Sequence, residues 1–122
     1  MPFRYQENTT PRGLPLLTVH ASGHISLADA EELGARIAPG GANHRWRVLT
    51  YAEKGLEYDP AARKYFPSMK SHFFALATVV TSPIIRAAIN MMMRLTGKSP
   101  DLRMFSDDAE ALAWLDTYEP GA

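Results

Sequence analysis

The chain has 122 residues, with 13 basic and 13 acidic side chains, and 46% of its residues are hydrophobic. This is the composition of a folded globular protein, and we expect one domain over residues 1–122. A neutral chain without a basic run is a poor candidate for binding nucleic acid. The lack of cysteine excludes disulfides, thiolate catalysis and Cys-ligated metals.

The N-terminal residues lack the apolar segment of a signal peptide. No window reaches the ~18 consecutive apolar residues that a membrane span requires. We therefore expect a cytoplasmic protein of bacterial type with no integral membrane segment.

The first half of the chain contains two units in which a strand precedes a helix. Residues 16–21, LLTVHA, predict a strand, and a helix follows from Ser26, its N-cap, to Ile37. Asp29 stands three residues after Ser26, where it can complete a capping box. Residues 3–6 are a candidate for an additional edge strand.

The second unit starts with a strand predicted over residues 47–52. Asp59 followed by Pro60 indicates the start of a helix, because Asp caps free amides and Pro fits the first helical position. Pro67 should shorten or kink this helix.

The second half repeats the pattern twice. Residues 73–80, FFALATVV, form a continuous apolar run, which is typical of a strand covered on both faces. A helix should follow over residues 82–97, then a strand over 102–105 and a helix from Ser106 or Asp107 to about Tyr118. Alternating strands and helices predict an α/β fold with a single four- to five-stranded, mostly parallel sheet and about four helices.

The helix predicted over residues 82–97 is more apolar than one face of a small sheet can cover. We expect its core row to be formed by Ile84, Ala88, Met91 and Leu95. A second row, with Ile85, Ile89 and Met93, then faces outward and needs a partner, a ligand or a lipid surface. The predicted interface consists of Ile85, Arg86, Ile89, Met92 and Met93.

No motif of catalysis or cofactor binding is present. The four histidines, His20, His24, His44 and His72, form no pair at metal-ligand spacing and are interpreted as solvated loop residues. No GxSxG motif exists, and the glycines of GARIAPGG follow a helix, unlike a phosphate-binding loop. We expect no metal, no cofactor and no enzymatic activity.

Two further groups of residues are candidates for binding. Glu53, Glu57, Tyr58 and Asp59 cluster where the carboxyl edge of the sheet is expected, the usual place for ligands in α/β folds. They predict a ligand or partner loop, although Asp59 could simply cap the next helix, and an enzyme that uses these carboxylates with a nearby histidine is a weaker hypothesis. An apolar pocket could be lined by Phe73, Phe74 and Met91.

Two segments resemble the STAS domain superfamily. Residues 16–33, LLTVHASGHISLADAEEL, are similar to its opening strand, glycine turn and capped helix. Residues 104–115, MFSDDAEALAWL, resemble the last strand and helix of the SpoIIAA-like branch, which is related to the lipid-binding SEC14 fold. The resemblance covers most of residues 14–118, which we take as the core of a single STAS-like domain.

The resemblance implies a role in signalling by partner switching, controlled by phosphorylation of a Ser in an Asp-Ser-x-Gly motif. This chain has Asp59-Pro60-Ala61-Ala62 at that place, and no hydroxyl matches the phosphorylated one. We therefore expect a non-enzymatic interaction or regulatory module that lacks this phosphoswitch and binds a protein partner or a second copy of itself. The alternative is a carrier or sensor of a small hydrophobic ligand or lipid.

Overall fold

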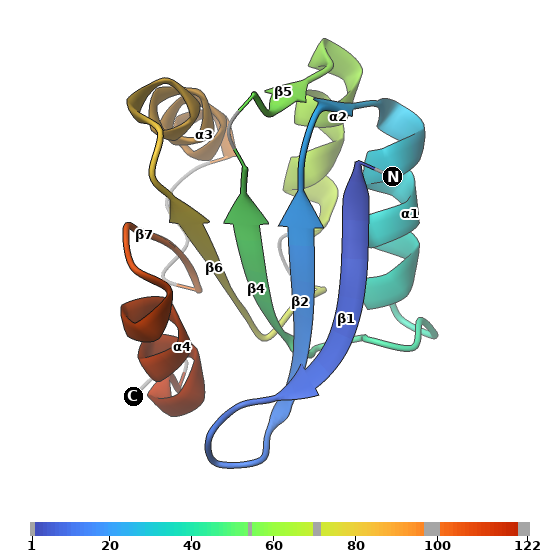
Figure 1. Cartoon of the computed structure of the whole chain (residues 1–122). Coiled ribbons are helices and arrows are strands. Elements are labelled where there is room, and N and C mark those ends of the chain that lie inside the picture. Colours follow the sequence, from blue (N-terminus) through green and yellow to red (C-terminus); the bar gives the residue numbers. More distant parts are fainter. Residues whose placement is uncertain (1, 54, 70–71, 97–100, 120–122) are drawn as a thin grey trace.

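The computed structural model describes residues 2–53, 55–69, 72–96 and 101–119, with residues 92–96 as backbone only. A five-stranded sheet has the order β1-β2-β4-β6-β7 (Figure 1). β1 pairs with β2 antiparallel, and all other neighbours in this sheet are parallel. The strands of this sheet are β1 (Phe3–Thr9), β2 (Pro15–Ala21), β4 (Arg47–Ala52), β6 (Ala75–Val80) and β7 (Leu102–Phe105). The predicted mostly parallel α/β sheet is confirmed.

Four α-helices connect or follow these strands. They are α1 (Leu27–Ile37), α2 (Pro60–Tyr65), α3 (Pro83–Thr96) and α4 (Asp108–Thr117). The capping box at Ser26 is confirmed, since its hydroxyl accepts from the Asp29 amide and Asp29 accepts from the Ser26 amide. Pro67 does end the second helix, because residues Phe66–Met69 continue as a 3-10 turn, η1.

A second, very small sheet was not expected from the sequence. β3 (His24–Ile25) and β5 (Glu57–Tyr58) pair in parallel, His24 with Glu57 and Ile25 with Tyr58. Both strands lie beyond the carboxyl ends of β2 and β4, at the top of Figure 1. Two-residue strands carry too little alternation to be recognised from sequence.

The sheet has an apolar core on each face. On one face, Leu17, Val19 and Val48 pack with residues of α1, α2 and α3. On the other face, Leu16, Leu49 and the alanines of β6 pack with Ala111 and Leu115 of α4. The continuous apolar sequence of β6 is explained by this double coverage.

The rotation of α3 differs from the prediction. Ile85 and Ile89, expected to face outward, are only 5% and 6% exposed and belong to the core shared with α1 and α2. Ile84 and Met91, expected in the core, are 82% and 60% exposed. The two rows are therefore reversed. The interface predicted at Ile85 and Ile89 is wrong, because buried side chains are not available to a partner.

The prediction for this helix included four other residues. The side chains of Met92, Met93 and Leu95 lie outside the described part of the structure. Arg86, a predicted interface residue, is half-buried and donates to the Val80 carbonyl at 3.3 Å and the Ser106 hydroxyl at 2.9 Å. These bonds join the first turn of α3 to β6 and to the segment before α4, and they help to set the rotation of the helix.

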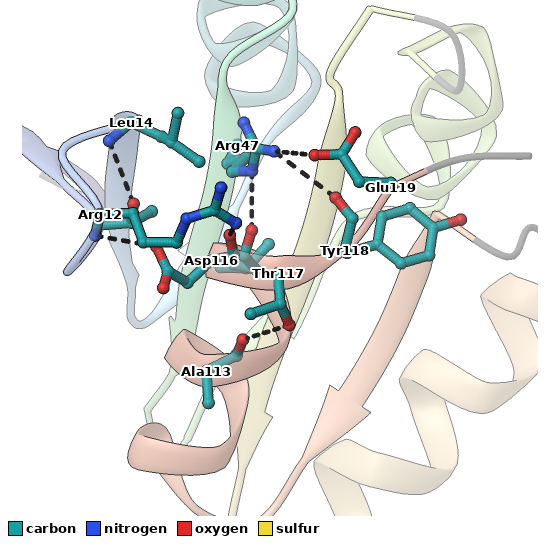
Figure 2. A network of polar contacts seen from close by, with 10 residues as sticks. Arg12, Leu14, Arg47, Ala113, Asp116, Thr117, Tyr118 and Glu119 are labelled. Atoms are coloured by element: carbon teal, nitrogen blue, oxygen red, sulfur yellow. Dashed lines mark hydrogen bonds and ion pairs between the residues drawn. The ribbon is translucent and has the colours of Figure 1, made fainter. Parts of the chain in front are cut away.

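A polar network fastens the C-terminal end of α4 to the sheet (Figure 2). Arg47, at the start of β4 and 9% exposed, donates from Nε to the Leu115 carbonyl at 2.7 Å. Its terminal nitrogen lies 3.5 Å from the Tyr118 carbonyl and 3.6 Å from the Glu119 carboxylate. A cation suits this place, because the last carbonyls of a helix lack partners within the helix.

The same end of α4 also holds the β1–β2 hairpin. The buried Asp116 carboxylate accepts from the Arg12 amide at 3.0 Å, and the Arg12 guanidinium donates to the Asp116 carbonyl at 3.3 Å (Figure 2). Residues separated by a hundred positions are thus joined in one network. Its role is structural, because its charged groups are directed at the chain's own backbone.

Candidate functional site

Charged residues do gather at the carboxyl edge of the sheet, as the sequence predicts. Glu53 follows β4, and its carboxylate lies 3.0 Å from the Arg4 guanidinium and 3.8 Å from the His20 ring. His24 of β3 lies 2.5 Å from the Asp59 carboxylate and 3.9 Å from that of Glu57. Each of the three predicted carboxylates therefore has a cationic or imidazole partner within the chain.

The histidines of this edge are not loop residues, contrary to our interpretation. His20 belongs to β2 and stacks on Tyr51 of the adjacent strand, with ring centroids 4.8 Å apart. His24 links β3 to the start of α2 through Asp59. Among the described residues, no three His, Asp or Glu side chains are grouped so as to hold a metal ion.

Asp59 occupies the N-cap position of α2, but its side chain makes no capping hydrogen bond. Its carboxylate is directed to His24 instead. The four contacts of these carboxylates with Arg4, His20 and His24 are partly exposed, and exposed ion pairs contribute about 0–1 kcal/mol each. The edge is best described as a set of weak links between β1, β2, β3 and the segment from β4 to α2.

Tyr58, the fourth residue of the predicted loop, packs inward. Its ring makes an edge-to-face contact with Phe66 at 5.4 Å and lies against the core below α1 and α2. Burial raises the pKa of its hydroxyl from 10.0 to about 12. A partly buried side chain in this position contributes to the packing of the fold, and its contact with a ligand or partner stays a prediction.

The raised pKa of Tyr58 predicts a loss of stability at alkaline pH. An unfolded chain releases the tyrosine proton near pH 10, whereas the folded chain retains it until about pH 12. The contribution is complete below pH 10 and decreases as the pH rises through this window, by about 1 kcal/mol at pH 11. Urea unfolding at pH 8 and pH 11 should show a smaller alkaline decrease for Tyr58→Phe than for the unchanged chain. An equal decrease in both would contradict this assignment.

The predicted apolar pocket does not form. Phe73 is buried in the core beneath α1, α2 and α3, whereas Phe74 packs in the core beneath α4, with the Arg47 guanidinium 4.2 Å above its ring. Met91 is exposed on α3. Phe73 and Phe74 stand just before β6 and pack in the cores on opposite faces of the sheet, so they do not line one cavity.

A small hollow lies between β1 and α1. Its cavity volume is about 10 Å³, and it is lined by Pro2, Phe3, Tyr5, Asp29 and Glu32. Ligand pockets usually measure about 300–1,000 Å³. This hollow is therefore too small for a lipid or a cofactor.

The outward face of α3 is the remaining candidate surface. Ile84, Ala87, Ala88 and Met91 are all exposed and recur at helical spacing along one side of the helix. We call these four residues the α3 stripe. α3 lies in the upper part of Figure 1, at the end of the sheet where the arrows of β2, β4 and β6 finish. The sequence correctly indicated an uncovered apolar row on this helix, but it assigned the wrong residues to it.

The arrangement of sheet and helices defines a SpoIIAA-like fold, as expected from the two sequence segments. Among solved structures, the chain is similar to an uncharacterized protein of the DUF3478 family from Shewanella loihica PV-4, which has a SpoIIAA-like fold. The TM-score is 0.66, the sequence identity is 16%, and 93% of each chain is covered. At this identity the likeness shows the fold alone.

Residues 13–119 match the family described as a domain of unknown function, DUF7793, and the chain belongs to this family. No curated protein is a significant match to the chain. Within the described residues, no helix has both the length and the hydropathy needed to cross a membrane.

Proposed function

We propose that this chain is a non-enzymatic interaction module that binds a protein surface through the α3 stripe. One observation carries the proposal: Ile84 is 82% exposed and Met91 is 60% exposed on a helix whose opposite side is held in the core. Ile85 and Ile89 are buried in the core, so the α3 stripe faces away from it. Exposed apolar side chains grouped on one face are typical of protein interaction sites.

The charged edge of the sheet supports a binding role over catalysis. Glu53 and Asp59 are occupied by Arg4 and His24, and no nucleophile lies beside a free base at this edge in the described structure. A carrier of a hydrophobic ligand receives no support, because Phe73 and Phe74 lie on opposite faces of the sheet. A regulatory role would then depend on which protein binds to the α3 stripe.

The proposal is tested with Ile84→Asp, a change on the surface of the first turn of α3. The variant should fold normally but lose at least about tenfold in affinity for a purified partner protein, since about 1.4 kcal/mol of apolar contact is removed. The partner is first captured from cells with the unchanged chain, and its Kd is then measured by calorimetry with both proteins purified.

Ala109→Asp is the matched control, because Ala109 is exposed and lies on α4, outside the α3 stripe. It introduces the same charge and should leave the affinity unchanged. If Ile84→Asp and Ala109→Asp bind every captured partner, and themselves, as the unchanged chain does, the proposed function is wrong.

A further inference from the structure

β1 stands at one end of the sheet, and in the described structure no strand lies on its side away from β2 (Figure 1). Two hydrogen bonds show which of its residues face that side. The Ser22 amide donates to the Pro2 carbonyl at 2.9 Å. The Thr10 amide donates to the Leu14 carbonyl at 2.8 Å. Because hydrogen-bonded residues alternate along an antiparallel pair, the even-numbered residues of β1 bond to β2. The odd-numbered residues direct their backbone N–H and C=O groups outward: Phe3, Tyr5, Glu7 and Thr9.

This open edge of β1 is able to accept another strand. An extended segment that pairs with a sheet edge gains backbone hydrogen bonds, and its alternate side chains provide specificity. Exposed edges are commonly protected by lysine, proline or free charges, and β1 contains neither lysine nor proline. Its two charged side chains are directed to residues of the same chain. Arg4 donates to Glu53 at 3.0 Å, and Glu7 accepts from Asn43 at 2.8 Å.

The surface beside this edge, on the side of α1, carries negative charge. The hollow between β1 and α1 lies here, with Phe3 and Tyr5 of the strand facing Asp29 and Glu32 of the helix. Glu32 is exposed and forms no ion pair within the described residues. Burial, together with the charge of Glu32, raises the pKa of the Tyr5 hydroxyl. Arg36, 4.0 Å above the Tyr5 ring, offsets only part of this charge, because α1 has three carboxylates and one guanidinium.

We propose that the open edge of β1 binds an extended segment of another protein that carries Lys or Arg side chains on the side of α1. A residue opposite Tyr5 projects its side chain to the same face of the sheet as Tyr5, where Asp29 and Glu32 lie. A basic side chain at this place meets two carboxylates, so the charges of the pair are complementary.

The same charges disfavour a second copy of this chain at the open edge of β1. In a two-fold pair across β1, the α1 helices of both copies stand on one side of the joined sheet. Each helix brings an excess of carboxylates, and like charges at an interface repel. The open edge of β1 is separate from the α3 stripe, so this inference goes beyond the proposed function.

Amide hydrogen exchange of the full chain, with and without a synthetic peptide, tests the inference. The peptide alternates Thr and Lys and has the length of β1, seven residues. In the free chain the outward amides of Tyr5 and Glu7 should exchange faster than those of Arg4 and Gln6, which bond to β2. At ~1 mM peptide, the exchange of Tyr5 and Glu7 should slow at least about tenfold, as a Kd of about 100 μM gives. A peptide with Glu in place of Lys should slow neither.

Two variants and a blocked peptide separate the contributions of charge and backbone. Glu32→Lys should abolish the effect of the Lys peptide, whereas Glu110→Lys, exposed on α4, is the matched control and should retain it. A Lys peptide methylated on alternate backbone nitrogens lacks the donors of a strand and should have no effect. Ile84→Asp should respond as the unchanged chain does, so the result does not depend on the α3 stripe.

The inference is overturned if the Lys peptide slows neither outward amide at ~1 mM. It is also overturned if the Glu peptide or the methylated peptide slows them equally, or if Glu32→Lys responds as Glu110→Lys does. None of these results affects the proposed function, which is tested at Ile84.

Discussion

Ile89→Asp should destabilise the protein strongly, whereas the same change at Ile84, five residues earlier on the same helix, should have little effect on its stability. Ile89 is 6% exposed in the core beneath α1, α2 and α3, and Ile84 is 82% exposed. Placing a carboxylate in an apolar core removes at least about 4 kcal/mol of stability. Domains have about 5–15 kcal/mol in total, so Ile89→Asp should lose a large part of its stability and unfold at a much lower urea concentration than the unchanged chain.

Ile84→Asp is expected to change stability by less than about 0.5 kcal/mol. It lies in the first turn of α3, where a carboxylate interacts favourably with the helix dipole. Circular dichroism and urea unfolding of the two variants provide the measurement. If Ile89→Asp is folded and Ile84→Asp is unfolded, α3 has the rotation that the sequence pattern alone predicts and not the one described here.

Arg47→Ala should lower the free energy of unfolding by about 2–4 kcal/mol, the second large effect. The change removes the charged donor to the Leu115 carbonyl and the cation above the Phe74 ring. It leaves carbonyl groups at the end of α4 without their partner, at a place that is mostly buried. Thermal unfolding should show a midpoint lowered by roughly 10 °C.

Arg103→Ala is the control for this change, because Arg103 lies on the edge strand β7 and is exposed. Its effect should stay within about 0.5 kcal/mol. Arg47→Lys keeps the charge, but its single amino group cannot replace the several N–H donors of the planar guanidinium. We therefore expect a stability between those of the unchanged chain and Arg47→Ala. If Arg47→Ala and Arg103→Ala unfold at the same midpoint, the network does not hold α4 to the sheet.

Much of the fold could be predicted because its signals are local. The strands at residues 47–52 and 102–105 agree with β4 and β7 residue for residue. Ser26 with Asp29 marks the start of α1, and Pro67 marks the end of α2. Capping groups and prolines act on the backbone beside them, so neither depends on the rest of the fold.

The rotation of α3 could not be predicted in the same way. Two apolar rows lie on this helix, and the pattern alone does not decide which one faces the sheet. The choice is made by contacts from distant parts of the chain, such as the bonds from Arg86 to Val80 and Ser106. The partners of Glu53 and Asp59 could not be predicted for the same reason, since Arg4 and His24 lie far from them in sequence.

The most direct test of the central claim is methyl NMR of the unchanged chain during titration with a purified partner protein. The central claim is that the α3 stripe is the surface through which the chain binds a protein. We predict that the methyl signals of Ile84 and Met91 shift as the partner is added, whereas that of Ile25, which is fully buried, does not. Signals of Ile84 and Met91 that stay constant up to saturation with the partner would contradict the account.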